Sequence, residues 1–157
     1  SSALKFFIFR VSWLYSYTHK SFFQTMLKLQ PNQKSFNVVD DQWGRPTSAS
    51  HLADFLNDFL SNDFKKENNY GLYNFSANGP KITWYGFAKY IFYQSYSMGY
   101  IKEQPEVLKL NTYSTVAERP KYSVLSNKNL EKKFNFLIDD WRVSVKNEIV
   151  SYYQRRA

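Results

Sequence analysis

Cysteine is absent from this chain of 157 residues, and glycine, proline and histidine are scarce, with five, five and two copies. The lack of cysteine excludes a disulfide framework, a thiolate metal site and a cysteine nucleophile. His19 and His51 stand far apart in the sequence, and neither has a second ligand at a useful spacing. We therefore expect no metal site, because a protein metal site needs several ligands close together.

Long apolar runs are also missing, and no stretch reaches the roughly eighteen residues of a membrane-spanning helix. The opening segment SSALKFFIFRVSWLY contains Lys5 and Arg10 and has no small-residue cleavage site. It is predicted to be a strand rather than a signal peptide. We expect a cytoplasmic protein with no membrane partner. Because the chain opens directly at this strand without an initiator Met, we also expect that an upstream part is missing.

The net charge of +8 and the pI of about 9.5 favour an anionic partner. Lysine and arginine are scattered along the sequence, so a small phosphorylated ligand fits as well as nucleic acid. Aromatic residues make up 20% of the chain, and with lysine they could form a stacking platform for single strands. Most Phe and Trp residues recur at helical spacing, where a core would need them, so we expect no nucleic-acid partner.

At this length the chain is predicted to be one domain or a fragment of one. Residues 4–15, LKFFIFRVSWLY, form a nearly continuous apolar run, which is typical of a strand covered on both faces. The spacing predicts further strands at 36–39 and 71–75, and helices at 20–29, after Thr47 or Ser48, and after Thr83. A loop, a short helix capped by Ser126 and a last helix capped by Asp139 are predicted to follow.

The alternation of strands and helices predicts an α/β fold with parallel strands. Three parallel strands make a thin sheet, which indicates the later half of a larger sheet. In open α/β sheets, ligands bind beyond the carboxyl ends of the strands. The turn DDQWGRPT, at residues 40–47, lies at such a strand end.

This turn has two interpretations, and the residues alone leave both open. In the first, Gln42 donates to and accepts from a ligand, Gly44 lets the backbone approach it, and Pro46 fixes φ before the helix. In the second, Asp40 and Asp41 only satisfy turn amides, and Gly44 and Pro46 only shape the loop. An acid–base pair of these two carboxylates is disfavoured, because adjacent residues at a strand end point in different directions.

Several segments together resemble the C-terminal half of the dTDP-4-dehydrorhamnose reductase family of extended short-chain dehydrogenases. They are IFRVSWLY, FFQTMLKL, NVVDDQWGRPT, GLYNFSANGPKITWYGFAKYIF, ERPKYSVLS and DDWRVSVK. The resemblance runs from about Lys5 to Tyr152. It implies the C-terminal half of a Rossmann-type NAD(P)-binding fold, with parallel strands alternating with helices and a helical substrate-binding end. It also implies reduction of the 4-keto group of a dTDP-linked deoxysugar by NADPH or NADH, the last step toward dTDP-rhamnose.

The family's cofactor-binding and catalytic motifs would precede residue 1. The five glycines contain no Gly-x-x-Gly-x-x-Gly fingerprint, and the family's Thr and Tyr-x-x-x-Lys catalytic set belongs upstream. The resemblance thus implies that residues 1–157 are a single domain or fragment, the substrate-binding half, and that the N-terminal cofactor-binding half is absent. We expect the chain alone to be inactive, with the missing half or a second copy in a homodimer as its protein partner.

The resemblance also implies four substrate-binding residues, Trp13, Gln42, Thr47 and Arg119. Trp13 corresponds to a family Trp that touches the sugar, and an indole offers an apolar face and an N–H. Gln42 and Thr47 would line the nucleotide side, while Arg119 would meet the diphosphate with its forked donors. Alternatively, Trp13 packs in the core, and Arg119 forms a surface ion pair with a neighbour such as Glu118.

This chain departs from the family pattern at three places. Lys20 and Ser21 stand where the family usually has Gly and Asn, so the local loop contacts are expected to differ. Trp43 is bulkier than many residues seen at its position. Tyr122 stands where many members have Asn, which weakens any specific polar contact expected from that position.

Tyr85 and Lys89, in YGFAK, fit the Tyr-x-x-x-Lys pattern of short-chain dehydrogenases. One helical turn would bring the ammonium near the phenol and favour the phenolate. The pattern also arises by chance in a chain with thirteen Tyr, and the resembled family uses this stretch as a packing helix. We therefore expect no catalytic role for Tyr85.

Two other functions stay open. The chain could be a non-catalytic sugar-nucleotide-binding or regulatory module that lost its redox chemistry. Less favoured is a basic, aromatic nucleic-acid binder, whose affinity would fall steeply with salt.

Overall fold

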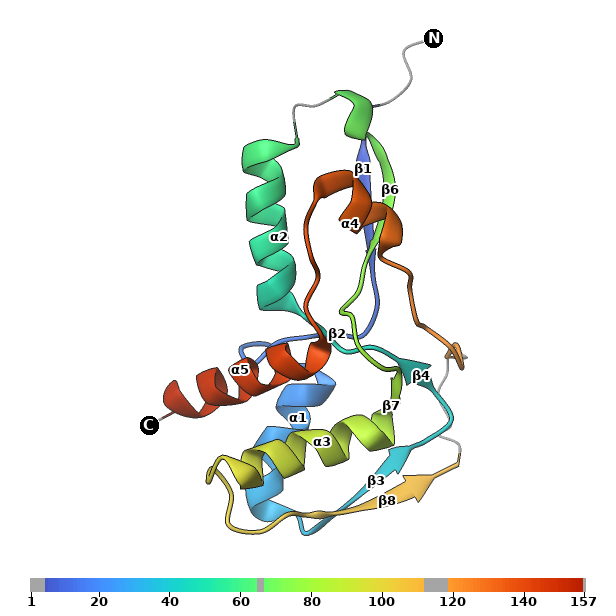
Figure 1. Ribbon diagram of the computed structural model, residues 1–157. Helices are drawn as coiled ribbons and strands as arrows, with labels where there is room; N and C mark the ends of the chain where they lie inside the picture. Colours follow the sequence, from blue (N-terminus) through green and yellow to red (C-terminus); the bar gives the residue numbers. More distant parts are fainter. Residues whose placement is uncertain (1–4, 65–66, 112–118, 157) are drawn as a thin grey trace.

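The structure is a computed structural model that describes residues 5–64, 67–111 and 119–156. Its elements form two packed groups, which lie one above the other in Figure 1. In the upper group, β1 (Phe7–Val11) and β6 (Gly71–Phe75) pair in parallel, with Phe7 opposite Gly71 and Val11 opposite Phe75. Helix α2 (Ala49–Asn62) and the short helix α4 (Lys128–Phe134) lie beside these strands (Figure 1).

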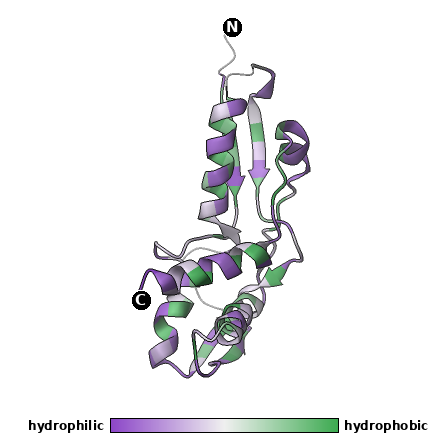
Figure 2. Cartoon of the chain, turned by 60° about the vertical axis from the view of Figure 1, so that its left-hand side comes forward, coloured by the Kyte–Doolittle hydropathy of each residue, from purple (hydrophilic) through white to green (hydrophobic). Residues whose placement is uncertain are grey.

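Aromatic rings fill the core of the upper group. The buried side chains are those of Phe55, Phe59, Tyr73, Phe75, Leu130, Phe134 and Ile138. Phe7 and Phe9 of β1 point toward α2, where both rings meet Phe59 edge to face. Apolar and polar residues alternate around α2, so that one face of the helix packs on the strands (Figure 2).

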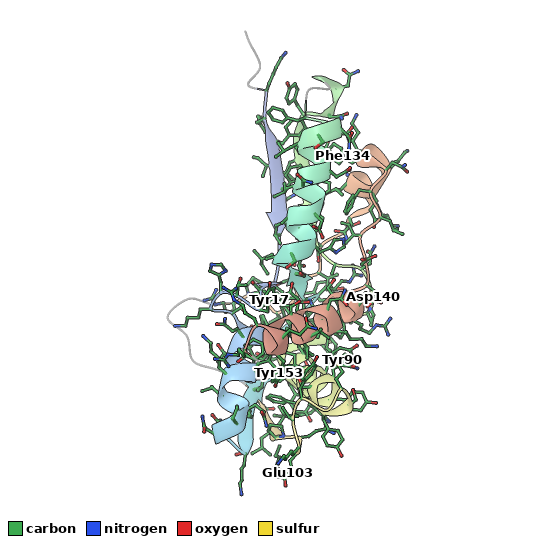
Figure 3. The ribbon with its side chains drawn as sticks, turned by 90° about the vertical axis from the view of Figure 1, so that its left-hand side faces the viewer. Tyr17, Tyr90, Glu103, Phe134, Asp140 and Tyr153 are labelled. Atoms are coloured by element: carbon green, nitrogen blue, oxygen red, sulfur yellow. The ribbon has the colours of Figure 1, made fainter. Side chains whose placement is uncertain are left out.

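The lower group contains a second parallel pair, β3 (Ser35–Val39) with β8 (Glu106–Leu110), and three helices. The helices are α1 (Phe22–Leu29), α3 (Trp84–Ser97) and α5 (Trp141–Gln154). Figure 3 shows Asp140 at the start of α5, Tyr153 near its end, and Tyr90 of α3 beside it. The core of this group is separate from the first and includes Phe23, Phe87, Ile91, Trp141 and Ile149.

Short elements connect the two groups. Strand β2 (Leu14–Tyr15) pairs in parallel with β5 (Thr47–Ser48), and β4 (Trp43–Gly44) pairs antiparallel with β7 (Ile82–Thr83). Two 3-10 helices, η1 (Gln30–Asn32) and η2 (Glu67–Asn69), complete the described elements. The turn at residues 40–47 therefore runs through both small strand pairs, between the two cores.

The α/β class and the parallel pairing predicted from the sequence are confirmed, but the single thin sheet is wrong. The three predicted strands belong to two separate two-stranded sheets, and β8 lies within the segment predicted to be a loop. The run predicted as one strand over 4–15 breaks at Ser12 and Trp13, because Trp13 has a φ of 50°. A positive φ takes the residue out of the extended region, so the strand cannot continue.

The helix starts show which residues cap the backbone. Ser21, Ser48 and Thr83 accept hydrogen bonds from the first helical amides, and Ser48 and Thr83 were predicted to do so. The last helix is capped by Asp140 rather than Asp139, because the Asp140 carboxylate accepts from Arg142 N. Helix α4 begins after Asn127 rather than Ser126, and the Asn127 side chain binds the backbone of Ser76 instead.

Within the described ranges, no helix is long and apolar enough to cross a membrane. The same part of the chain holds no group of three or more His, Asp or Glu side chains that could ligate a metal ion.

Candidate functional site

A cleft of about 930 Å³ opens in the lower group, between α1, the end of β3, the start of α3 and residues 119–123. Its lining combines apolar side chains with a few polar ones, as ligand sites usually do. The lining residues used below are Trp13, Phe22, Gln42, Trp84 and Arg119. Three of the four substrate-binding residues predicted from the sequence therefore line one cleft.

Trp13 stacks on Trp84, another residue of the cleft lining. The centres of the two rings are 3.7 Å apart at an angle of 8°, and the centre of the Phe22 ring is 4.7 Å from that of Trp84, at an angle of 50°. Trp13 is partly exposed, and its packing on Trp84 agrees with the packing alternative, while its contact with a sugar stays a prediction. One face of the indole packs against Trp84, while the rest of the side chain contributes to the cleft wall.

Gly44 lies against the same indole. A β-carbon at position 44 would stand 2.3 Å from Cε2 of Trp13, which is closer than any real contact. The absence of a side chain at Gly44 therefore leaves room for the Trp13 indole. The sequence had suggested a different use of this glycine, a close approach of the backbone to a ligand.

The side-chain amide of Gln42 has a defined orientation. Trp84 Nε1 donates to Gln42 Oε1 at 3.2 Å. An indole N–H can only donate, so the oxygen of the amide must face it. The amide nitrogen of Gln42 keeps its two N–H groups for an acceptor, such as a carbonyl or a phosphate oxygen.

Arg119 is exposed and lines the cleft from the segment 119–123. This segment is attached to β4 by two backbone hydrogen bonds, Trp43 N to Lys121 O and Ser123 N to Trp43 O, each 2.8 Å long. The alternative partner Glu118 lies outside the described residues. A guanidinium at the mouth of a cleft is suited to an anionic ligand, because its five donors stay charged.

Thr47 does not line this cleft. It is 1% exposed, its hydroxyl accepts from Ala77 N at 3.2 Å, and its own N–H donates to Trp13 O at 3.0 Å. Thr47 thus connects the segments that follow β1 and β6. Its predicted contact with a nucleotide stays a prediction.

The neighbouring Ser48 leads to a buried carboxylate that the sequence did not indicate. Ser48 Oγ donates to Glu148 Oε1 at 2.6 Å, and Tyr17 N donates to Glu148 Oε2 at 2.9 Å. Glu148 is 3% exposed, on α5, a hundred residues from Ser48 along the chain. Burial, with the Glu148 charge as the second cause, raises the pKa of Tyr15 well above its usual value. Hydrogen bonds to both oxygens explain how this carboxylate is accommodated in the interior.

Asp40 fixes the start of the turn to two other elements. Its carboxylate accepts from Thr83 Oγ1 at 2.6 Å and forms an ion pair with Lys109 at 2.7 Å. The hydrogen bond from Lys109, and then that from Thr83, lower the pKa of Asp40. The Asp40 carboxylate therefore holds the end of β3 to β8 and to the start of α3, a structural role that differs from the predicted capping of turn amides. Oδ1 of Asp41 is buried without a hydrogen-bond partner in the described part of the chain.

Tyr85 and Lys89 lie outside the cleft lining. The Lys89 ammonium is 5.5 Å from the centre of the Tyr85 ring, and the Lys109 ammonium is 5.0 Å from the same centre. Both cations therefore lie near the ring, in the manner of cation–π contacts. Trp84, which directly follows the predicted helix cap Thr83, lines the cleft, although the sequence analysis treated it only as part of a packing face.

A model of the RmlD substrate binding domain family matches residues 1–154. The chain is 33% identical over 144 residues to dTDP-4-dehydrorhamnose reductase of Escherichia coli (strain K12), a match that covers 90% of this chain and 48% of that protein. The chain spans about half the length of the curated relatives it matches.

Two crystal structures of dTDP-4-dehydrorhamnose reductases resemble the fold. The protein from Clostridium acetobutylicum superposes with a TM-score of 0.79 at 32% identity, and that from Bacillus anthracis, solved with NADP, with 0.78 at 30%. Each match covers 94% of this chain and 49% of the other. These similarities confirm the resemblance seen in the sequence and the predicted half of a Rossmann-type fold.

Proposed function

The chain belongs to the RmlD substrate binding domain family, and from this membership we propose that it is the nucleotide-sugar-binding half of a reductase. The enzyme would reduce the 4-keto group of a dTDP-linked deoxysugar with NADPH or NADH, and it would act in the cytoplasm. The observation that carries the proposal is the convergence of Trp13, Gln42 and Arg119 on one cleft.

Each of the three residues offers a different kind of contact. The Trp13 indole gives an apolar surface and an N–H beside a deoxysugar. Gln42, whose amide oxygen is held by Trp84, donates its N–H groups to a base carbonyl or a phosphate oxygen. Arg119 supplies a permanent positive charge for the diphosphate. Together these contacts suit an anionic ligand with both apolar and polar parts.

The residues present do not fit the nicotinamide cofactor by themselves. A pyrophosphate is usually held by a glycine-rich turn between a strand and a helix N-terminus. Gly44 lies against Trp13, Gly79 lies against Asp140, and Gly86 is inside α3, so none of these three forms such a turn. We therefore assign cofactor binding and the proton donor to a second, N-terminal half, and this chain to holding and orienting the sugar nucleotide.

The test is a titration of the purified chain with dTDP and, separately, with NADPH. Saturable dTDP binding without NADPH binding is expected from a half that holds only the nucleotide sugar. The same pattern would come from a non-catalytic sugar-nucleotide module. The two are separated by adding the N-terminal half and the keto-sugar, since only the enzyme half gives NADPH oxidation. Failure to bind dTDP would overturn the proposal.

A nucleic-acid-binding function is less well supported, because the aromatic rings are mostly packed in the two cores. Single-stranded oligonucleotides are the matching control in the same titration. Binding that falls steeply with salt would favour that function instead.

A further inference from the structure

Trp43 is the central residue of a small three-segment sheet at the edge of the cleft. On one side it pairs with Thr83 of β7, and on the other its backbone forms the two hydrogen bonds with Lys121 and Ser123. The outer segment begins with Arg119, two residues before the bonded carbonyl of Lys121. The position of Arg119 at the cleft thus depends on how firmly residues 121–123 are held to Trp43.

One ammonium group lies near rings from two of these segments. Lys81 Nζ is 4.9 Å from the centre of the Trp43 ring and 5.3 Å from the centre of the Tyr122 ring. The two rings are partly exposed, at 38% and 58%. A cation at such distances from an aromatic face is attracted to it. Because Trp43 and Tyr122 come from different segments, a single cation can hold both.

We infer that Lys81, held between Trp43 and Tyr122, is a positioning residue that keeps Arg119 at the mouth of the cleft. Its effect on affinity for a nucleoside diphosphate rests on the proposed function. The structure brings the rings of Trp43 and Tyr122 together around a lysine that precedes β7.

The binding experiment uses dTDP and five variants of the chain. Lys81→Met removes the charge and keeps an apolar stem, and it is expected to weaken dTDP binding about three- to tenfold, since the competent position of Arg119 becomes less populated. Lys81→Arg restores a cation that can stack on both rings, so its affinity should stay near that of the parent. Lys89→Met is the matched control, because it removes a cation beside a different ring, that of Tyr85.

The fourth and fifth variants are Arg119→Ala alone and Arg119→Ala combined with Lys81→Met. If Lys81 acts through Arg119, the Lys81→Met change has no further effect once Arg119 is gone. An equal loss with and without Arg119 would show that Lys81 acts by its own charge, and this overturns the inference. An unchanged affinity in Lys81→Met overturns it as well.

A second measurement does not depend on the ligand. The Ser123 amide donates to Trp43 O, and its hydrogen exchange reports whether residues 121–123 stay attached. Exchange should be at least about threefold faster in Lys81→Met and close to the parent rate in Lys81→Arg and Lys89→Met. If no variant binds dTDP, the proposed function fails, and this exchange rate alone decides the inference. An unchanged rate in Lys81→Met would then overturn it.

Discussion

Gly44 lies so close to Trp13 that a side chain at position 44 would overlap the indole, with the β-carbon 2.3 Å from Cε2. The same indole stacks on Trp84 at 3.7 Å. The ring therefore has little room to move, and the turn at residues 40–47 contributes to the cleft by packing against a lining residue.

Gly44→Ala should therefore disturb the indole stack. Forcing a methyl group into a packed site costs roughly 1 to 3 kcal/mol, which denaturant unfolding would measure. The near-UV circular dichroism of the two coupled indoles should also decrease. Gly99→Ala is the control for a loss of stability without a steric clash. Nothing lies within 4 Å of a β-carbon at position 99, so the alanine would lose stability only because its φ of 77° is unfavourable for a residue with a side chain. A Gly44→Ala spectrum like that of the parent would show that Trp13 adapts without leaving the stack.

Asp40→Asn should make the free energy of unfolding depend less on pH in the acid range. The pKa of Asp40 is lowered in the folded state, so its contribution is complete above the unfolded pKa of about 3.9 and is lost as the pH falls through the folded pKa. Near neutral pH the variant should lose about 1 kcal/mol or less, because the ion pair is at the surface. Below about pH 4 the difference from the parent should shrink.

The measurement is urea unfolding between pH 2 and pH 7, with Asp54→Asn as the control on an exposed face of α2. A constant difference between Asp40→Asn and the parent at every pH would mean that the charge of Asp40 has no part in stability.

The sequence predicted the local elements better than their assembly. Residues 71–75 form the predicted strand, and Thr83 caps the predicted helix, because both signals depend on adjacent residues. Strand β8 was missed because EVLKL is short and becomes a strand only by pairing with β3, seventy residues away. The break at Trp13 was missed because a positive φ is uncommon for a non-glycine residue and no local pattern indicates it.

Part of the cleft lining could be predicted because it follows strands that the sequence indicates. Trp13 and Gln42 both follow strands, and the ends of parallel strands are where ligands collect. Thr47 belongs to the same strand-end turn as Gln42, but its side chain is buried, and its hydroxyl accepts a hydrogen bond from the Ala77 amide. The buried pair of Ser48 and Glu148 joins residues a hundred positions apart, so one sequence alone could not reveal it.

Arg119→Ala, in a complete enzyme that contains this chain, should weaken binding of the dTDP-sugar far more than binding of the cofactor. Losing a charge-assisted donor to phosphate costs about 1.5 to 3 kcal/mol, or roughly a tenfold to hundredfold change in the dissociation constant. Arg155→Ala, at the end of α5 and outside the cleft lining, is the control for lost positive charge. Equal substrate affinity in Arg119→Ala and the parent would remove Arg119 from the site.

Tyr85→Phe, in the same complete enzyme, should leave turnover nearly unchanged. Tyr85 does not line the cleft, and its ring faces two lysine ammonium groups instead of a ligand. Steady-state rates with the keto-sugar and NADPH test this directly. A fall of more than about a hundredfold, the scale of a lost general acid, would identify Tyr85 and Lys89 as the catalytic pair.

Residues 1–157 alone should not oxidise NADPH in the presence of the dTDP-4-keto-sugar. The proposed reaction would need a hydride donor held against the carbonyl carbon and an acid that protonates the carbonyl oxygen. The five glycines include no fingerprint for a pyrophosphate, and no Asp or Glu lines the cleft among the residues that the structure describes.

The chain alone should also be poorly stable or self-associating. Ile8 and Leu72 lie opposite each other on β1 and β6, and each remains 46% exposed. Paired parallel strands are usually covered on both faces, so this exposed apolar pair is a place for further strands or helices to pack.

Turnover would be measured from the absorbance of NADPH with the chain and the keto-sugar and, in a second arm, with the N-terminal half added. Turnover only in the second arm is expected, because the two halves together would supply the cofactor site and the acid. Rapid turnover by the chain alone would contradict the proposal that the other half supplies the cofactor site and the acid. Tyr85 and Lys89 would then be the candidate catalytic pair.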